Sequence, residues 1–236
     1  MLNAHPMVHI TNEARVFAWA HHALKSLDHQ QIALAERPEF ESYLRRELAV
    51  LLRGYYRERW SHTSVWGDKN PHYAAPGHGD LLGTVVDLFP SARFIHVIRD
   101  GRDVVASLVQ MRHPGGDPWT SFEEAHYVWN SHVTYARDFA INASPGTVLE
   151  VRYEELVADD LLLAERMCDF LGLECHSKVA QFCEEQQRGR TPLSDPTRDL
   201  SGGASHSDWE RIVSERGRRD ESLELLRENL IRFGYV

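Results

Sequence analysis

The sequence has few cysteines and no long apolar run. Its three cysteines, Cys168, Cys175 and Cys183, are too few for a disulfide framework and too widely spaced for a CxxC motif. They are expected to be reduced thiols in a cytoplasmic protein, because the start of the chain shows no basic region followed by an apolar signal segment. No stretch approaches the roughly 18 apolar residues that a membrane-spanning helix requires.

Other absences exclude classes of function. The net charge of −9 argues against a general nucleic-acid-binding protein, although a local basic pocket for a small anion is compatible with it. The chain has 14 histidines but neither an HExxH nor a CxxC-type pattern, so no metal site is predicted. It also lacks GxGxxG and a GxxxxGK segment followed by Ser or Thr. This argues against an intact kinase, NTPase or dinucleotide-dependent enzyme.

What is present is typical of one globular domain over residues 1–236. The 42% hydrophobic and 26% charged contents are ordinary for a soluble protein, and 236 residues are enough for a sizeable α/β core. The clearest helix is predicted over 38–60. Its apolar residues recur at helical spacing and are Phe40, Leu44, Leu48, Leu51, Leu52 and Tyr55.

Predicted strands and helices alternate along the middle of the chain, which implies crossover helices and a parallel sheet. The strands or extended stretches are 64–67, 93–98 and 147–151. The helices are 16–33, 38–60, 78–89, one that follows the segment 99–102 and ends at about 111, 121–142 and a last one reaching about 171. Residues 188–206 are rich in Gly, Pro, Ser and Thr and are predicted to form a loop, followed by two short helices from Ser207.

Arg99 directly follows the compact strand over 93–98. Ligands of parallel α/β sheets bind outside the carboxyl ends of the strands, and the next helix offers free N–H groups and a positive dipole end to a phosphate. Ser107 lies eight residues further on, about two helical turns along. Spacing alone equally allows an arginine that caps a sheet edge and a serine that faces solvent.

A family resemblance supports the phosphate interpretation. The segment IRDGRDVVASL is similar to the sulfotransferase segment whose Arg and Ser hold the 3′-phosphate of the sulfate donor 3′-phosphoadenosine 5′-phosphosulfate (PAPS), and Arg99 and Ser107 match them. VRYEELV resembles the family segment whose Tyr lies near the nucleotide, which implies that role for Tyr153. Ser207 resembles a Ser before a Trp that reaches the donor in tyrosine-protein sulfotransferases. A buried strand-end tyrosine is the alternative for Tyr153.

Two further segments resemble the family at positions that carry the reaction. WGDKNP resembles the Lys-containing loop of protein-tyrosine sulfotransferases and their bacterial relatives, so Lys69 would contact the transferring group and stabilise its charge. MLNAHPMVHITNEARVF is similar to the stretch whose Glu is the catalytic base, which implies that role for Glu13. A carboxylate suits a hydroxyl or phenol acceptor. The alternative for Lys69 is a solvated surface charge, and the alternative for Glu13 is an acidic residue in the first turn of a helix.

The resemblance also defines a difference from the family. There, a strand and a loop reading roughly PRSGTT precede the segment that matches residues 1–17, and the loop cradles the 5′-phosphosulfate. This first strand and loop are expected to be missing from the chain. A start site assigned too late and a truncated fragment are favoured over a naturally non-catalytic relative.

The resemblance implies a three-layer α/β fold like that of P-loop NTPases, with a parallel sheet flanked by helices. It implies a sulfotransferase that moves a sulfuryl group from PAPS to the hydroxyl of a phenol, sugar, peptide or small molecule, releases adenosine 3′,5′-bisphosphate and needs no metal. One alternative is a non-catalytic module that binds a nucleotide or partner. Another is a P-loop kinase of a small hydroxyl compound. The sequence does not specify an oligomeric state.

Overall fold

The computed structural model describes every residue except 30–35 and 188–205. The chain divides into two compact units, so the single domain predicted over 1–236 stays a prediction. The first unit consists of Met1–Phe94, Ala143–Leu149 and Leu161–Cys183. The second consists of Ile95–Asn142, Glu150–Asp160 and Glu184–Val236.

The first unit contains a pair of parallel strands. β1 (Val8–Asn12) pairs with β2 (Val65–Lys69), and the register runs from Val8 opposite Val65 to Asn12 opposite Lys69. β1 was not predicted, although Val8 and Ile10 alternate with polar neighbours as a strand requires. β2 extends past the predicted stretch 64–67, so Lys69 is the last residue of a strand.

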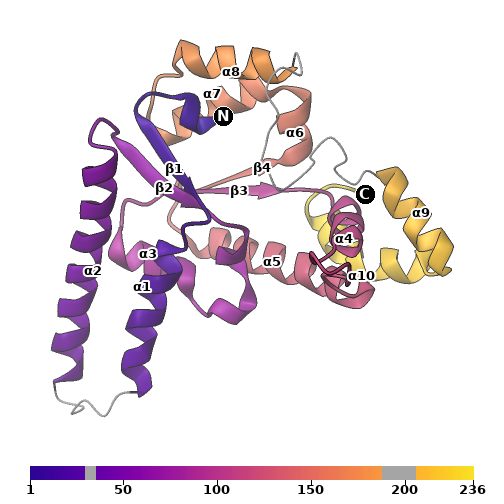
Figure 1. Cartoon of the computed structure of the whole chain (residues 1–236), viewed down its shortest axis with the longest axis horizontal. Helices are drawn as coiled ribbons and strands as arrows, with labels where there is room; N and C mark the ends of the chain where they lie inside the picture. Colours follow the sequence, from indigo (N-terminus) through magenta and orange to yellow (C-terminus); the bar gives the residue numbers. More distant parts are fainter. Residues whose placement is uncertain (30–35, 188–205) are drawn as a thin grey trace. The chain divides into compact units, whose positions relative to one another are not determined.

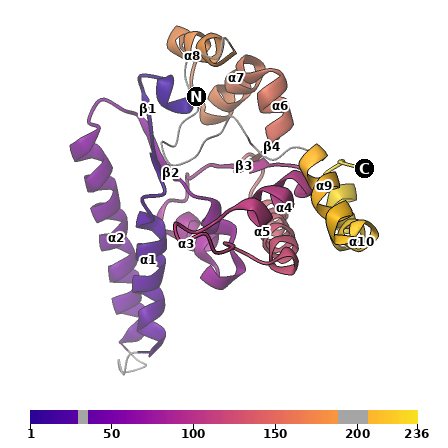
Figure 2. The same cartoon turned by 45° about the vertical axis from the view of Figure 1, so that its right-hand side comes forward.

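Three helices build the main apolar core of the first unit. They are α1 (Val16–Lys25), α2 (Arg37–Arg59) and α3 (Leu81–Leu88), and Figures 1 and 2 both show α1 beside α2. The helix predicted from 78 begins later, because Gly79 has a φ of 59° and the Asp80 side chain caps α3 by accepting the Gly83 N–H. The buried core residues include Phe17, Ala20, Leu24, Leu48, Leu52, Leu81, Val85 and Leu88.

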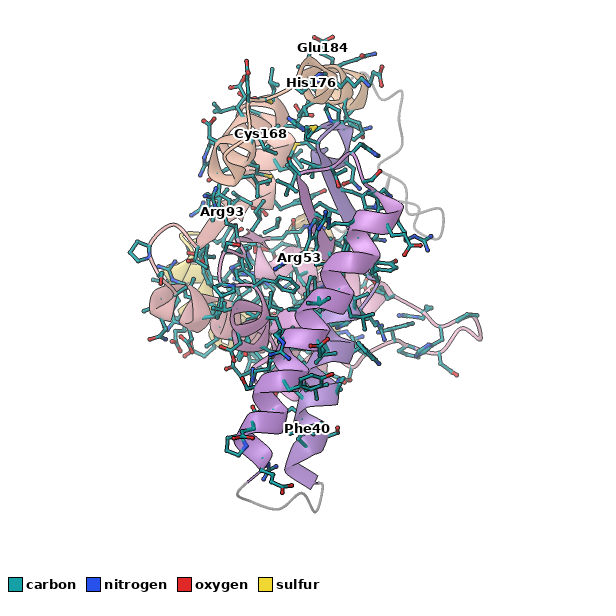
Figure 3. All side chains as sticks on the ribbon, turned by 90° about the vertical axis from the view of Figure 1, so that its left-hand side faces the viewer. Phe40, Arg53, Arg93, Cys168, His176 and Glu184 are labelled. Atoms are coloured by element: carbon teal, nitrogen blue, oxygen red, sulfur yellow. The ribbon has the colours of Figure 1, made fainter. Side chains whose placement is uncertain are left out.

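The buried side of α2 differs from the predicted one. Leu48, Leu52 and Tyr56 are buried at four-residue spacing, whereas Phe40 and Leu51 are 43% and 56% exposed. Figure 3 shows α2 lengthwise and labels Phe40 near its beginning. Neighbouring positions such as Leu51 and Leu52 lie about 100° apart around a helix, and in α2 the buried side carries Leu52 while Leu51 is exposed.

The helices after β4 (Val148–Arg152) also differ from the prediction. In place of one helix reaching 171, α6 (Tyr153–Ala158) and α7 (Asp160–Leu171) are separated at Asp159. A further helix that was not predicted, α8 (Ser177–Gln187), follows them. Cys168, Cys175 and Cys183 are free thiols on or between α7 and α8.

In the second unit, helices surround a buried aromatic and aliphatic core. The strands β3 (Phe94–Ile98) and β4 (Val148–Arg152) pair with each other and lie mostly in this unit. Its helices are α6 together with α4 (Gly101–Gln110), α5 (Phe122–Asn142), α9 (His206–Arg216) and α10 (Arg219–Arg232). Core residues include Ile98, Val105, Val109, Phe122, Trp129, Trp209, Val213, Leu226 and Leu230.

These elements confirm an α/β fold with parallel strands. The described strands form two separate pairs, β1–β2 and β3–β4. The two helices predicted at the end of the chain are α9 and α10, and the predicted loop 188–206 lies, apart from its last residue, outside the described residues. Within the described residues, no helix is both long and apolar enough to span a bilayer.

His96, on β3 of the second unit, is a partly buried ionisable group. His96 Nδ1 is 3.3 Å from Glu150 Oε1, and the Arg137 guanidinium pairs with the same carboxylate. Burial, followed by the charge of Arg137, lowers the pKa of His96 to about 4. Since histidine in an unfolded chain titrates near 6.5, the unfolded state binds an extra proton between these two values. The stabilisation is therefore complete above about pH 6.5 and is lost as the pH falls towards 4.

We expect His96→Gln to remove this part of the acid sensitivity. The free energy of unfolding of the wild type, minus that of the variant, should be about 2–3 kcal/mol larger at pH 7 than at pH 4.5. Urea unfolding of both proteins at the two pH values measures this difference, and titrations common to both proteins cancel. An equal difference at both pH values would contradict the assignment.

Candidate functional site

The predicted site residues fall into two groups, one in each unit. Glu13 and Lys69 lie in the first unit, and Arg99, Ser107 and Tyr153 lie in the second. Each group is described within its own unit. Ser207 is the second residue of α9, but its side chain is outside the part of the chain that the structure describes.

The structure brings Glu13 and Lys69 into contact at the carboxyl ends of β1 and β2. The Glu13 backbone N–H donates to the Lys69 carbonyl at 2.8 Å, continuing the strand pairing by one residue. The Lys69 Nζ donates to Glu13 Oε1 at 3.1 Å. Both side chains are accessible to solvent, with 60% exposure for Lys69 and 41% for Glu13. Because an exposed ion pair contributes little to stability, the importance of this pair lies in its chemistry: a carboxylate, which can act as a base, lies beside an ammonium cation.

The segment after β1 has an unusual backbone. Glu13 and Arg15 both have a φ of 56°, in the left-handed region that non-glycine residues seldom occupy. The Asp68 carboxylate holds this turn, because Oδ1 accepts the Ala14 N–H at 3.1 Å and Oδ2 accepts the Arg15 N–H at 3.3 Å. Asp68 was not predicted from the sequence as a site residue, although it directly precedes Lys69.

Two side-chain hydroxyls complete the contacts of Asp68. Thr11 Oγ1 lies 2.7 Å from Asp68 Oδ1, and the Tyr73 hydroxyl donates to Asp68 Oδ2 at 2.5 Å. The Tyr56 hydroxyl lies 2.9 Å from Thr11 Oγ1. Burial raises the pKa of Tyr56 to about 12, and burial together with the hydrogen bond to Asp68 raises the pKa of Tyr73 well above its usual value. Both phenols therefore keep their protons at neutral pH.

In the second unit, Arg99 meets Tyr153 at the end of β3. The Arg99 guanidinium lies over the Tyr153 ring, with Cζ 4.9 Å from the ring centroid, as in a cation–π contact. The same guanidinium pairs with Asp103 of α4 at 3.4 Å, and the Arg99 carbonyl accepts the Trp129 indole N–H at 3.1 Å. Ser107 is half-buried about two turns along α4. That Ser107 and Arg99 bind the same phosphate stays a prediction.

The turn between β3 and α4 is fixed by further charged groups. Asp100 caps α4 by accepting the Arg102 N–H at 2.9 Å, and its own N–H donates to Glu154 Oε1 at 3.0 Å. Arg102 pairs with the Asp100 carboxylate at 2.6 Å and donates to the Tyr235 carbonyl. The guanidinium of Arg102 thus supports the turn itself.

The described residues contain no group of three or more His, Cys, Asp or Glu side chains that could hold a metal ion. The chemistry available in the first unit is that of an exposed carboxylate beside an ammonium. The second unit offers a guanidinium against an aromatic ring at the start of a ten-residue helix. A guanidinium and a helix N-terminus both suit a phosphate group.

Comparison with known proteins yields curated relatives that are similar to part of the chain. Two are named "Putative protein-tyrosine sulfotransferase": one from Caenorhabditis briggsae is 33% identical over 104 residues, and one from Caenorhabditis elegans is 36% identical over 96 residues. The alignments cover 44% and 39% of this chain and 37% and 36% of those proteins. The chain thus matches little more than a third of the length of these relatives.

Two solved structures are similar to most of the chain. A sulfotransferase domain from the curacin biosynthetic pathway is 14% identical, with a TM-score of 0.47, covering 85% of this chain and 78% of that domain. A sulfotransferase domain from the Synechococcus PCC 7002 olefin synthase is 16% identical, with a TM-score of 0.49, covering 89% and 93%. A family model described as "Sulfotransferase family" matches residues 1–177 of the 236, and the chain therefore belongs to the sulfotransferase family.

Proposed function

We propose that the protein transfers a sulfuryl group from PAPS to an acceptor hydroxyl and releases adenosine 3′,5′-bisphosphate. The observation that carries this proposal is the contact between Glu13 and Lys69 at the carboxyl ends of two parallel strands. Ligands of α/β proteins with parallel sheets bind at this edge, and family membership makes sulfuryl transfer the reaction to test.

In the proposed reaction, the Glu13 carboxylate accepts the proton of the acceptor hydroxyl as the acceptor oxygen attacks sulfur. The new S–O bond forms while the bond from sulfur to the bridging oxygen of the donor breaks, and its electron pair stays on the departing phosphate. The Lys69 ammonium stabilises the negative charge that develops on this oxygen and on the sulfuryl group. As in phosphoryl transfer, positioning and charge stabilisation supply most of the catalysis.

The second unit supplies the proposed nucleotide contacts. Arg99 and Ser107 would bind the 3′-phosphate beside the N-terminal end of α4, Tyr153 would lie against the nucleotide, and Ser207 would reach the donor. The position of the Arg99 guanidinium over the Tyr153 ring supports this proposal, because one group can then serve the phosphate and the other the planar base. The phosphate would compete with Asp103 for Arg99.

We expect Arg99→Ala to weaken binding of adenosine 3′,5′-bisphosphate by roughly 10- to 150-fold. A hydrogen bond to a charged group is worth about 1.5–3 kcal/mol. Calorimetry with adenosine 3′,5′-bisphosphate and with adenosine 5′-monophosphate isolates the 3′-phosphate, since only the first ligand should lose affinity. Arg227→Ala, at an exposed position of α10, is the matched control. Equal losses for both ligands would contradict a 3′-phosphate contact.

The acceptor is proposed to be a hydroxyl compound, and a tyrosine side chain in a peptide is the first to test, because the curated relatives carry protein-tyrosine sulfotransferase in their names.

Thermal shift separates the proposed donor from a kinase substrate. Adenosine 3′,5′-bisphosphate should raise the melting temperature more than ATP with Mg²⁺ does. The reverse order would support a kinase.

A further inference from the structure

We infer that Asp68 is a positioning residue for the reaction: it fixes the turn that carries Glu13 and thereby the catalytic carboxylate. This inference rests on the proposed function. Asp68 does not need to contact the substrate, since its contacts are with the chain on either side of Glu13.

The Asp68 carboxylate is saturated by four donors from the first unit. Oδ1 accepts from Thr11 Oγ1 at 2.7 Å and from the Ala14 N–H at 3.1 Å. Oδ2 accepts from the Arg15 N–H at 3.3 Å and from the Tyr73 hydroxyl at 2.5 Å. An ionised carboxylate offers about four lone-pair sites, so this arrangement uses the whole acceptor capacity of the side chain.

Three consecutive backbone N–H groups are thus bound to two consecutive residues of β2. Glu13 N–H donates to the Lys69 carbonyl, and the N–H groups of Ala14 and Arg15 donate to the Asp68 carboxylate. Left-handed backbone at a non-glycine residue is unfavourable and persists only where its surroundings impose it. The chain has this conformation at Glu13 and again at Arg15. Asp68 supplies what imposes it, because it binds the amides that follow Glu13.

The position of Asp68 in β2 links the base to the cation. Asp68 pairs with Thr11 across the two strands, and the next residue, Lys69, pairs with Asn12 and bonds to Glu13. The dipeptide Asp68–Lys69 therefore has two roles: the Asp68 carboxylate holds the Glu13 turn, and Lys69 provides the ammonium beside Glu13. A change at Asp68 should move Glu13 relative to Lys69 while the nucleotide contacts proposed in the second unit are untouched.

Asp68→Asn tests this with little change in shape. An amide nitrogen cannot accept a hydrogen bond, so whichever side it occupies loses two acceptor positions. The hydroxyl on that side can turn to accept from the amide, whereas the backbone N–H of Ala14 or Arg15 is left without its acceptor. We expect kcat to fall about 100-fold, the scale of a displacement of about 1 Å at a reacting group, with the KM for PAPS unchanged.

The decisive comparison is a double-mutant cycle with Glu13→Gln. If Asp68 acts through Glu13, Asp68→Asn should cost nothing further once Glu13 is replaced. Asp80→Ala is the control, because it removes the side-chain cap of α3 in the same unit without touching the Glu13 turn. It should lower the melting temperature and leave kcat unchanged. An equal loss of kcat from Asp68→Asn in both Glu13 backgrounds, or an equal loss in Asp80→Ala, would overturn the inference.

A second measurement needs no variant. Ala14 and Arg15 are exposed residues outside any helix or strand, yet their amides should exchange slowly with deuterium, because Asp68 binds them. Fast exchange of both amides in the wild-type protein would overturn the inference whatever the activity. The proposed function has its own tests. It is overturned if the wild type does not sulfate any hydroxyl acceptor or if Glu13→Gln retains full turnover. Because the inference rests on the proposed function, either result overturns the inference as well.

Discussion

Replacing Glu13 with glutamine is expected to lower kcat for sulfuryl transfer by about two to four orders of magnitude, the usual contribution of a general base. Glutamine keeps the size of the side chain and can still accept a hydrogen bond from Lys69, but it cannot take the proton of the acceptor. Because the proposed nucleotide contacts lie in the other unit, affinity for adenosine 3′,5′-bisphosphate should be unchanged. The variant therefore separates the chemical step from donor binding.

Measuring kcat with labelled PAPS and binding by calorimetry tests both parts of this prediction. Glu47→Gln is the matched control, since Glu47 is an accessible glutamate of the same unit that pairs with an arginine on α2. It should behave like the wild type. Near-normal turnover by Glu13→Gln would exclude Glu13 as the base, and loss of nucleotide binding would show that the substitution acts beyond the chemical step.

The sequence predicts the elements that have a strong local signal. The strand over 93–98 appears as β3 at Phe94–Ile98, and the helix over 121–142 appears as α5 at Phe122–Asn142. β1 was missed because it is five residues long and buries only Val8 completely, so its alternation is faint. The single helix reaching 171 was predicted because nothing in its apolar spacing marks the break at Asp159.

The candidate site shows the same division between local and non-local signals. Glu13 and Lys69 were predicted separately, each from its own segment, and their contact depends on the parallel pairing of strands that are more than fifty residues apart. Asp68 could not be predicted as a structural centre, because its four donors come from three separate places in the chain. A motif shows which residue types are present, whereas their hydrogen-bond partners depend on the fold.

Replacing Lys69 with methionine is expected to lower kcat by about 10²–10³-fold, as does removal of one group that stabilises charge in a transition state. Methionine keeps an unbranched chain of similar length but has no charge or N–H donor. Stability should barely change, because the ion pair with Glu13 is exposed and such pairs contribute about 0–1 kcal/mol.

This combination distinguishes a catalytic lysine from a structural one. Activity and melting temperature are measured for Lys69→Met and for the control Lys25→Met, at an exposed lysine near the end of α1. The control should match the wild type in both. Lys69→Arg should recover only part of the rate, because a planar guanidinium does not reproduce a compact ammonium. A Lys69→Met enzyme that is less stable but retains its kcat would show that Lys69 serves the strand ends and not the transferring group.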